Sequence, residues 1–306
     1  MESVVDVESM EPVLDVRNVT KAYEGFTLRD VSFSLPRGFI MGLIGHNGAG
    51  KTTLLSLILN LVHADAGEIR VFGLDHKREE VAVRSRIGFV HETPTFFASL
   101  SVERAASVMA PFYPTWDDVG FLKLTEEFGL PREKKLGRLS QGMRTRFALA
   151  AALSHGAELL LLDEPSSGLD PAFRRDLLER LSGVIQGGRS SVLFSTHITS
   201  DLDRIADYVT FLRQGRLIFS TTREDLMERW FLVKGSPDLL SEETRPFFVG
   251  VDAGEYGFTG LTERLPELKD RAAGKAMVVE PASLEDVVFY TGRTGKEGLR
   301  LHGHSR

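Results

Sequence analysis

A glycine-rich turn between an apolar run and a helix-like run carries the residues with the clearest capacity for chemistry. Residues 40–55 read IMGLIGHNGAGKTTLL, so two glycines separated by four residues are followed by Lys51 and Thr52. This spacing fits the phosphate-loop pattern, in which glycine backbones curl until successive N–H groups point at phosphate oxygens. The positive N-terminal end of the following helix adds to that attraction. We therefore expect nucleotide binding, with Lys51 on the β- and γ-phosphates and the Thr52 hydroxyl on Mg²⁺.

Two acidic residues follow another strand-like run, residues 158–162, which ends in four leucines. Asp163 and Glu164 follow it directly, and a buried carboxylate without a partner is costly. A Mg²⁺ ion held by Thr52 would supply a partner for Asp163. Glu164 could then act as the base for an attacking water, which is the division of labour in phosphate-loop hydrolases. The alternative interpretation is a capping Asp and a surface Glu.

Two more side chains, His197 and Tyr23, each allow a structural and a functional interpretation. His197 lies just past the strand-like run 191–195, at the sheet edge where open α/β sheets bind ligands. A histidine in that place could equally be structural. Tyr23 follows the first strand pattern and either covers the apolar side of the sheet or stacks on a nucleotide base.

The strand patterns predict an α/β fold in which an antiparallel flap lies beside a parallel core. Alternating apolar residues indicate a half-buried strand at 13–19, and residues 27–35 show two short strand patterns. Residues 67–73 have the pattern of an edge strand followed by a turn. Further strands are expected directly before the glycine-rich turn and at residues 86–90, 158–162 and 191–195.

Residues 93–139 are predicted to form a helical insertion, because prolines interrupt a helix-like spacing throughout this stretch. Insertions of this kind commonly carry partner contacts. This one is rich in aromatic residues, which could form its own core or a docking surface. Ser140 is the expected N-cap of the strongly apolar helix that follows. Pro171 is expected in the first turn of a later helix, where no N–H is required.

The composition describes a globular chain. It has 306 residues, of which 42% are hydrophobic and 26% charged, and its net charge of -6 argues against nucleic acid as the main partner. The absence of cysteine fits the cytoplasm. No stretch offers the roughly 18 apolar residues that a transmembrane helix needs, and the acidic start does not have the pattern of a signal peptide. A role at a membrane would therefore require a partner protein.

Together these motifs resemble the ATP-binding subunits of ABC transporters, over about residues 13–229. The resemblance rests on six segments in the order of that family: GHNGAGKTT, IGFVHE, LSQGM, LLLLDEP, SSGLD and FSTHITSD. It implies a P-loop NTPase core with ATP and Mg²⁺ as ligands. It also implies adenine stacking on Tyr23, Mg²⁺ ordered by Asp163, an attacking water polarised by Glu164 and a γ-phosphate contact for His197. The residues that it implies for phosphate binding are Gly45, His46, Asn47, Gly48, Ala49, Gly50, Lys51, Thr52 and Thr53.

The resemblance further implies two protein partners. The signature segment Ser140, Gln141 and Gly142 would reach the nucleotide of a second cassette, identical or different, and Asp170 would lie at that dimer interface. A separate integral membrane subunit would form the transport pathway, which places this chain in the cytoplasm at the inner face of the cell membrane. The other class considered is a soluble ABC ATPase of translation or DNA maintenance. Members of that class resemble tandem cassettes or cassettes split by coiled coils, whereas this chain has one phosphate loop and no sustained heptad run.

Two departures from the family pattern fall near the expected γ-phosphate. Glu92 stands where the family usually has Gln, and the usual LSGGQ is altered at Gln141 and Met143. We expect Glu92 either to turn toward Mg²⁺ or to swing away until the transporter subunit draws its loop in. A solvent-facing loop residue without a role is the alternative. In these altered positions the chain resembles the exporter branch of the family, which includes ATPases of bacterial antibiotic-peptide export and self-resistance.

The expected domain organisation has four parts. An acidic leader covers residues 1–12, and the ATPase domain covers residues 13–229 with a helical subdomain at about 93–155. A shift in composition then indicates a small C-terminal α+β domain at 230–291. Its expected elements are short strands at 247–251 and 277–279 and a closing helix at 281–287. Residues 292–306, rich in Gly, Arg and His, are predicted to be a disordered tail.

Overall fold

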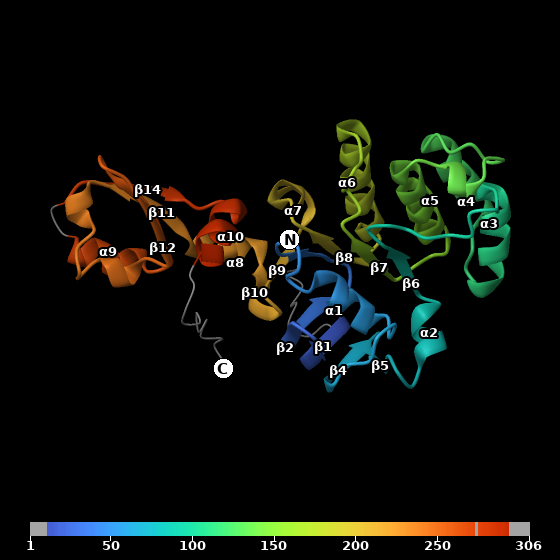
Figure 1. The fold of residues 1–306 in the computed structure, drawn as a ribbon, viewed down its shortest axis with the longest axis horizontal. Coiled ribbons are helices and arrows are strands. Elements are labelled where there is room, and N and C mark those ends of the chain that lie inside the picture. The colour runs from blue at the N-terminus through green and yellow to red at the C-terminus, as the bar shows by residue number, and fades with distance from the viewer. Residues whose placement is uncertain (1–10, 273–274, 294–306) are drawn as a thin grey trace, which may run out of the picture. The chain divides into compact units, whose positions relative to one another are not determined.

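The computed structural model describes residues 11–272 and 275–293, which divide into two compact units. Unit 1 ends at Ser220 and unit 2 begins at Thr221. Unit 1 contains a ten-stranded sheet and unit 2 a four-stranded sheet (Figure 1). The sequence placed the division after residue 229, whereas the compact units divide inside β10 (Arg216–Thr222).

The sheet of unit 1 joins an antiparallel flap to a parallel core, which confirms the predicted fold class. Its strand order is β5-β4-β1-β2-β10-β9-β3-β8-β7-β6. The flap consists of β1 (Pro12–Tyr23), β2 (Phe26–Pro36), β4 (Ala66–Val71) and β5 (Leu74–Asp75). The core consists of β3 (Ile40–Ile44), β6 (Ile87–Val90), β7 (Leu159–Asp163), β8 (Ser191–Thr196) and β9 (Tyr208–Arg213). Every residue of β3, β7 and β8 is buried, as expected for parallel strands that are covered on both faces.

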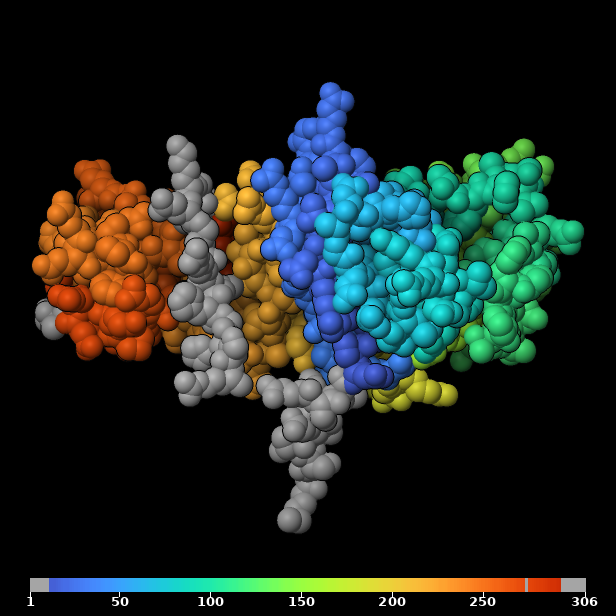
Figure 2. Space-filling view, turned by 90° about the horizontal axis from the view of Figure 1, so that it is seen from below, coloured from blue at the N-terminus to red at the C-terminus, as the bar shows by residue number. Residues whose placement is uncertain are grey.

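Some helices of unit 1 follow the core strands, and others form the predicted insertion. The insertion is drawn in green in Figures 1 and 2. The helices of unit 1 are α1 (Lys51–Ile58), α2 (Glu80–Arg84), α3 (Val102–Met109), α4 (Asp118–Glu127), α5 (Gln141–Ser154), α6 (Pro171–Ile185) and α7 (Thr199–Ile205). The Oγ of Ser140 accepts a hydrogen bond from the N–H of Met143 and caps α5, as predicted. Short 3₁₀ turns cover Ala110–Phe112 and Leu136–Arg138. In Figure 2 the insertion forms the green part of the surface of unit 1.

Strand β2 differs from its prediction because it is one strand of 11 residues rather than two short ones. Asp30, in its middle, has a φ of +49°, and so does Asn18 on β1. The register of the two strands shifts in this region, and Asn18 Nδ2 donates to Asp30 Oδ1 at 2.7 Å. Asn and Asp tolerate the left-handed conformation better than other residues with a side chain. The polar interruption is therefore a bulge within a continuous strand pair.

Residues 67–73 were expected to form an edge strand, but the strand found there, β4, is second from the edge of the sheet. Strand β4 pairs with β1 on one side and with β5 on the other. The two-residue β5 therefore forms the edge. Such a short edge strand limits pairing with other chains.

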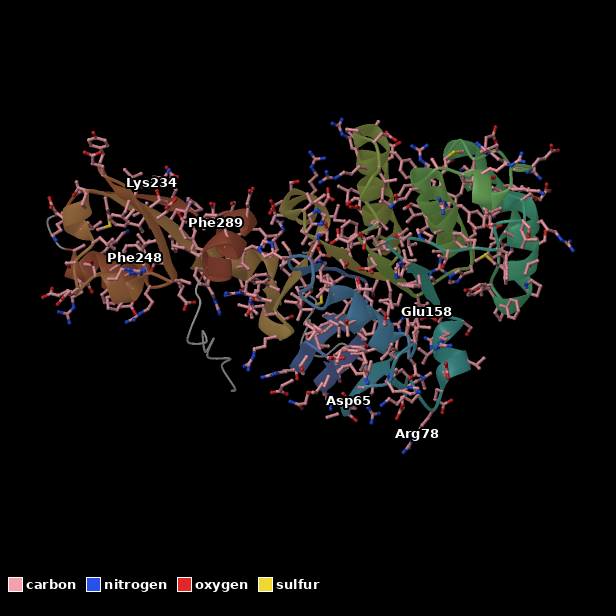
Figure 3. All side chains as sticks on the ribbon, viewed as in Figure 1. Asp65, Arg78, Glu158, Lys234, Phe248 and Phe289 are labelled. Carbon is pink, nitrogen blue, oxygen red and sulfur yellow. The ribbon has the colours of Figure 1, made fainter. Side chains whose placement is uncertain are left out.

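Unit 2 is a small α+β domain, as predicted. Its strand order is β12-β13-β11-β14, with antiparallel pairs throughout. The strands are β11 (Phe231–Gly235), β12 (Gly250–Ala253), β13 (Phe258–Thr262) and β14 (Met277–Pro281). The helices are α8 (Arg223–Arg229), α9 (Leu265–Arg271) and α10 (Leu284–Arg293). Its core includes Phe248, labelled in Figure 3, whose ring meets that of Phe258 edge-on at 5.3 Å.

Two details of unit 2 differ from the sequence expectation. The strand expected at 247–251 begins only at Gly250, because Pro246 lies in a 3₁₀ turn, Arg245–Phe247. Another such turn covers Pro237–Leu239. Helix α10 runs to Arg293, two residues into the expected tail, while the rest of that tail and most of the expected leader lie outside the described residues. Within the described residues, no helix is both long and apolar enough to cross a membrane.

Candidate functional site

The glycine-rich turn lines a pocket of about 450 Å³ at the start of α1. Gly48 and Gly50 have φ angles of +79° and +109°, a region that other residues rarely adopt. A Cβ on Gly45 would lie 2.5 Å from the carbonyl oxygen of Leu212, so glycine is required there as well. The turn therefore curls as the sequence predicted. The pocket is lined by Phe26, His46, Asn47, Gly48, Ala49, Gly50, Lys51, Thr52, Thr53, Glu92 and Glu164.

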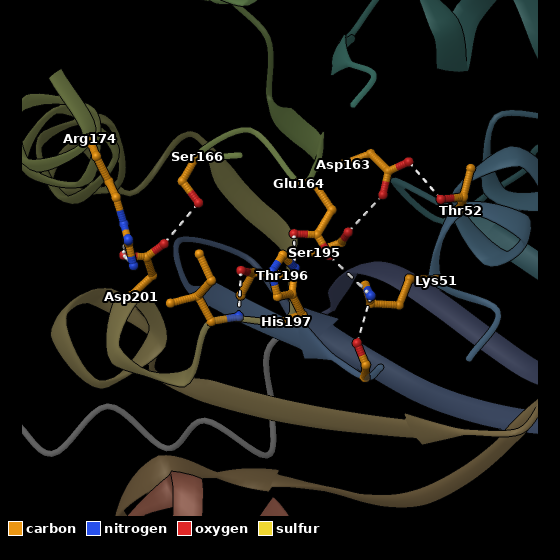
Figure 4. A network of polar contacts seen from close by, with 12 residues as sticks. Lys51, Thr52, Asp163, Glu164, Ser166, Arg174, Ser195, Thr196, His197 and Asp201 are labelled. Carbon is orange, nitrogen blue, oxygen red and sulfur yellow. Dashed lines mark hydrogen bonds and ion pairs between the residues drawn. The ribbon is translucent and has the colours of Figure 1, made fainter. Parts of the chain in front are cut away.

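Lys51 turns back onto this loop and also meets Glu164 (Figure 4). Its Nζ donates to the carbonyl oxygen of Gly45 at 2.7 Å and lies 3.1 Å from Glu164 Oε1. Both charged side chains are buried, with 6% and 7% of their surface exposed. The second oxygen of Glu164 lies 2.8 Å from Nδ1 of His197, whose ring is about half exposed. Ammonium, carboxylate and imidazole thus form one chain of contacts between residues that are distant in the sequence.

The backbone of Glu164 has an unusual conformation. Its φ is +48°, which costs a residue with a side chain about 1–2 kcal/mol. Its N–H donates to the carbonyl oxygen of Ser195 at 3.1 Å, and its own carbonyl accepts from Ser167 at 3.0 Å. The turn after β7 is therefore held by β8, at the carboxyl edge of the sheet.

Asp163 lies at the end of β7 and is completely buried. Its Oδ2 accepts from Thr52 Oγ1 at 2.8 Å, and its Oδ1 accepts from Ser195 Oγ at 2.7 Å. In the described part of the chain, no group of three or more His, Asp or Glu side chains forms a ready metal site. A hydroxyl and one carboxylate nevertheless fit Mg²⁺, which is commonly held by one or two carboxylates together with waters and phosphate oxygens. Glu92, exposed and just beyond β6, adds a second carboxylate to the pocket lining.

The structure places Phe26, rather than Tyr23, in the pocket lining. The two residues pair across the turn between β1 and β2. Tyr23 is 44% exposed, and Lys21 Nζ lies 5.6 Å from the centre of its ring. The tip of the Phe26 ring is so close to the phosphate loop that a Cβ on Gly50 would lie 2.9 Å from it. Sequence reasoning missed Phe26, and the only available signal was its place in the turn next to Tyr23.

The signature segment does not line this pocket. Gln141 and Gly142 begin α5, and a Cβ on Gly142 would lie 3.6 Å from the carbonyl oxygen of Gly168. Asp170 caps α6 by accepting from the N–H of Phe173 at 3.0 Å. It also accepts from Arg146 at 2.6 Å. The Phe173 N–H and the Arg146 charge lower the pKa of Asp170, so this half-exposed carboxylate stays ionised.

Comparisons with known proteins identify what this geometry resembles. The sequence model of the family described as "ABC transporter" matches residues 28–167. A bacitracin transport ATP-binding protein of Enterococcus faecalis is 33% identical over 223 residues, which are 72% of each chain. A Nod factor export ATP-binding protein I of Burkholderia orbicola is 32% identical over 312 residues, covering 93% of this chain and 98% of that protein. A solved structure, "ATP binding subunit of ABC transporter", is 28% identical with a TM-score of 0.65, and the similarity covers 71% of this chain and 92% of that one.

Proposed function

This chain belongs to the ATP-binding subunits of ABC transporters, and we propose that it hydrolyses Mg-ATP through Glu164 to drive an exporter. The observation that carries the proposal is the chain of contacts from Lys51 through Glu164 to His197 at the phosphate loop. It places a cation for phosphate, a carboxylate for water and an imidazole at one sheet edge. The similar proteins are named for bacitracin transport and for Nod factor export.

The phosphate loop is proposed to hold ATP. N–H groups of residues 45–53 and the Nζ of Lys51 neutralise the phosphate oxygens, helped by the N-terminal end of α1. Thr52 and Asp163 would hold Mg²⁺, with Glu92 as a further carboxylate on the same pocket. When bound, Mg²⁺ neutralises charge on the phosphate oxygens. Tyr23 remains the proposed adenine contact, and the position of Phe26 supports a second aromatic contact beside it.

Glu164 is proposed to orient and deprotonate the attacking water. Its carboxylate lines the pocket, with an ion pair to Lys51 at one oxygen and a contact with Nδ1 of His197 at the other. A base held in this way loses little entropy when the water attacks the γ-phosphate, because the geometry of the base is already set. His197 is half exposed and can contact the γ-phosphate while it keeps Glu164 in place.

A second cassette is proposed to complete the site, because the signature segment lies outside the pocket of its own chain. Ser140, Gln141 and Gly142 would contact the nucleotide of the partner cassette. Asp170 would lie at the same interface, where its exposed carboxylate is already oriented by Arg146. Homodimer and heterodimer both fit these contacts.

A membrane subunit is the other proposed partner, and an apolar groove in the insertion offers it a docking site. The groove measures about 510 Å³ and follows Glu92 closely in the sequence. Phe97 and Phe112 are 76% and 75% exposed on it, which is unusual for large apolar side chains. By contrast, Phe96 packs edge-on against Phe147 in the core of the insertion. A partner of this kind would place the chain at the inner face of the cell membrane. The net charge of -6 argues against nucleic acid as a further partner.

The substitution Glu164→Gln tests the proposal. It keeps the shape of the side chain and removes the base, so hydrolysis should fall about 10²–10⁴-fold while ATP still binds. Light scattering should also show that this variant is a dimer with saturating Mg-ATP and a monomer with ADP. The matched control is Glu103→Gln. Glu103 lies on α3, outside the pocket, and its carboxylate pairs with Arg132. Near-normal hydrolysis by the Glu164 variant would refute the assignment.

A further inference from the structure

A buried carboxylate, Asp201, connects the turn after β7 with the start of α7 (Figure 4). It lies four residues after His197, and only 3% of its side chain is exposed. Its Oδ2 accepts from Ser166 Oγ at 2.8 Å, and Ser166, two residues after Glu164, is also buried. Its Oδ1 accepts from the Nε of Arg174 at 2.7 Å. Both oxygens of Asp201 are therefore used by groups from other parts of unit 1.

These contacts close a ring around the proposed catalytic pair. From Glu164 the chain runs two residues to Ser166, whose hydroxyl binds Asp201. From Asp201 it runs back four residues to His197, whose ring contacts Glu164 at 2.8 Å. The two turns are thus joined twice, once at the pocket and once in the buried interior. The second connection matters because Glu164 has an unfavourable backbone conformation that surrounding contacts must maintain.

The charge of Asp201 is matched to its place. An ionised carboxylate this deeply buried is stable only when it is paired and fully hydrogen-bonded. Arg174, from the first turns of α6, provides the counter-charge with 29% of its side chain exposed. An Asn at this position could still accept from Ser166, but it would leave the guanidinium without its counter-charge. The acid is therefore needed to hold both neighbours at once.

We propose that Asp201 is a positioning residue for ATP hydrolysis, which keeps Glu164 and His197 in contact without touching the nucleotide. The proposal rests on the proposed role of Glu164. Asp201 is not part of the pocket lining, and neither is Ser166. Lys51 and the glycine-rich turn, which bind phosphate in the proposed function, line the pocket instead. Loss of Asp201 should therefore lower the rate of hydrolysis and leave ATP binding nearly unchanged.

The test uses the full-length chain with Asp201→Asn and, as a milder change, Ser166→Ala. We expect kcat to fall about 10–100-fold for Asp201→Asn, because small misplacements of catalytic groups have effects of this size. KM for ATP and the Kd for ATP should change by less than about threefold, as expected when only transition-state interactions are lost. Asp201→Glu, which restores the charge, should recover part of kcat.

A double-mutant cycle with His197→Ala separates positioning from a general loss of structure. If Asp201 acts through the Glu164–His197 contact, Asp201→Asn should cost much less in the His197→Ala background than alone. Ser166→Ala should likewise add little to Asp201→Ala, since each of these changes removes the hydrogen bond between Ser166 and Asp201. Additive losses, or a rise in KM as large as the fall in kcat, would overturn the proposal.

Two controls separate this proposal from the proposed function. Glu103→Gln, at an exposed ion pair on α3, should leave kcat unchanged. Glu164→Gln should lower turnover about 10²–10⁴-fold in the same assay. If Glu164→Gln loses hydrolysis but Asp201→Asn and Ser166→Ala keep it, only the positioning role fails. If Glu164→Gln keeps hydrolysis, the proposed function fails with it.

Discussion

Replacing Glu158 with Gln should destabilise unit 1 without slowing ATP hydrolysis. Glu158 lies directly before β7, at the opposite end of that strand from Asp163, and is labelled in Figure 3. Arg86 contacts both of its oxygens, at 2.5 and 2.9 Å, and Arg37 contacts one at 2.8 Å. The guanidinium of Arg86 also lies 3.8 Å from the centre of the Phe72 ring. This cluster ties the starts of the core strands to the flap.

The expected size of the effect follows from the pKa of Glu158. Hydrogen bonds from Arg86 first, and then from Arg37, lower this pKa from 4.5 to about 2. At 1.36 kcal/mol per pKa unit, the difference corresponds to about 3 kcal/mol in favour of the folded chain. The side chain is 32% exposed, so solvent screening reduces a realistic figure to about 1–2 kcal/mol. Loss of the charge in Glu158→Gln should cost about this much.

Denaturant unfolding provides the measurement. The chain has two tryptophans, and a Trp230→Phe background leaves Trp116 to report on unit 1. A folded-state pKa below the unfolded value means that the unfolded chain binds the proton first as pH falls. The contribution of Glu158 is therefore complete above about pH 4.5 and is lost as pH falls toward 2.

In Glu158→Gln, the unfolding free energy should lack this part of its dependence on pH. In Glu103→Gln, which alters an exposed ion pair, the dependence should remain. An unfolding free energy within about 0.5 kcal/mol of the parent would refute this reasoning, since surface substitutions commonly fall in that range.

Two further predictions concern a buried imidazole and the pocket. His155 is 2% exposed and stacks on Tyr113 at 4.1 Å, and burial lowers its pKa. Its contribution to stability should be complete above about pH 6.5 and decline below it, because the unfolded chain then binds the proton more readily. His155→Phe should flatten this dependence in the same unfolding assay, and an unchanged slope would contradict it. Glu92→Gln should weaken Mg²⁺ binding in the presence of ATP but not metal-free nucleotide binding. Calorimetric titration with Mg²⁺ measures this, and superimposable curves would remove Glu92 from the metal site.

The parts of the fold and site that could be predicted from the sequence are those encoded over a few neighbouring residues. The phosphate loop needs glycines where φ is positive or where a backbone approaches closely, so its spacing is visible in the chain itself. Asp163 and Glu164 were recognisable because these acidic residues directly follow four consecutive leucines. The flap, the parallel core and the insertion also followed from local patterns of apolar residues and prolines.

Residues whose importance comes from long-range contacts were not predictable in this way. Asp201 has the pattern of an ordinary acidic residue in the first turn of a helix, and only the fold brings Ser166 and Arg174 to it. In the sequence, Phe26 is only an apolar residue beside a turn. Its place next to the phosphate loop becomes visible only in the folded structure. Asp30 interrupts a strand pattern, and the sequence alone does not show that Asn18 pairs with it in a bulge.

Lys51 lies where it could link nucleotide binding to the position of Glu164. The ammonium is shared between the carbonyl oxygen of Gly45 and the carboxylate of Glu164, and both partners are close and buried. The ammonium has three N–H donors, so it keeps one for a phosphate oxygen, which would then lie close to the carboxylate of Glu164. Glu164 is the partner that phosphate would displace, because two like charges about 4 Å apart repel by roughly 4 kcal/mol at an effective dielectric constant of 20. Binding would therefore free one oxygen of Glu164 for water, while His197 keeps hold of the other.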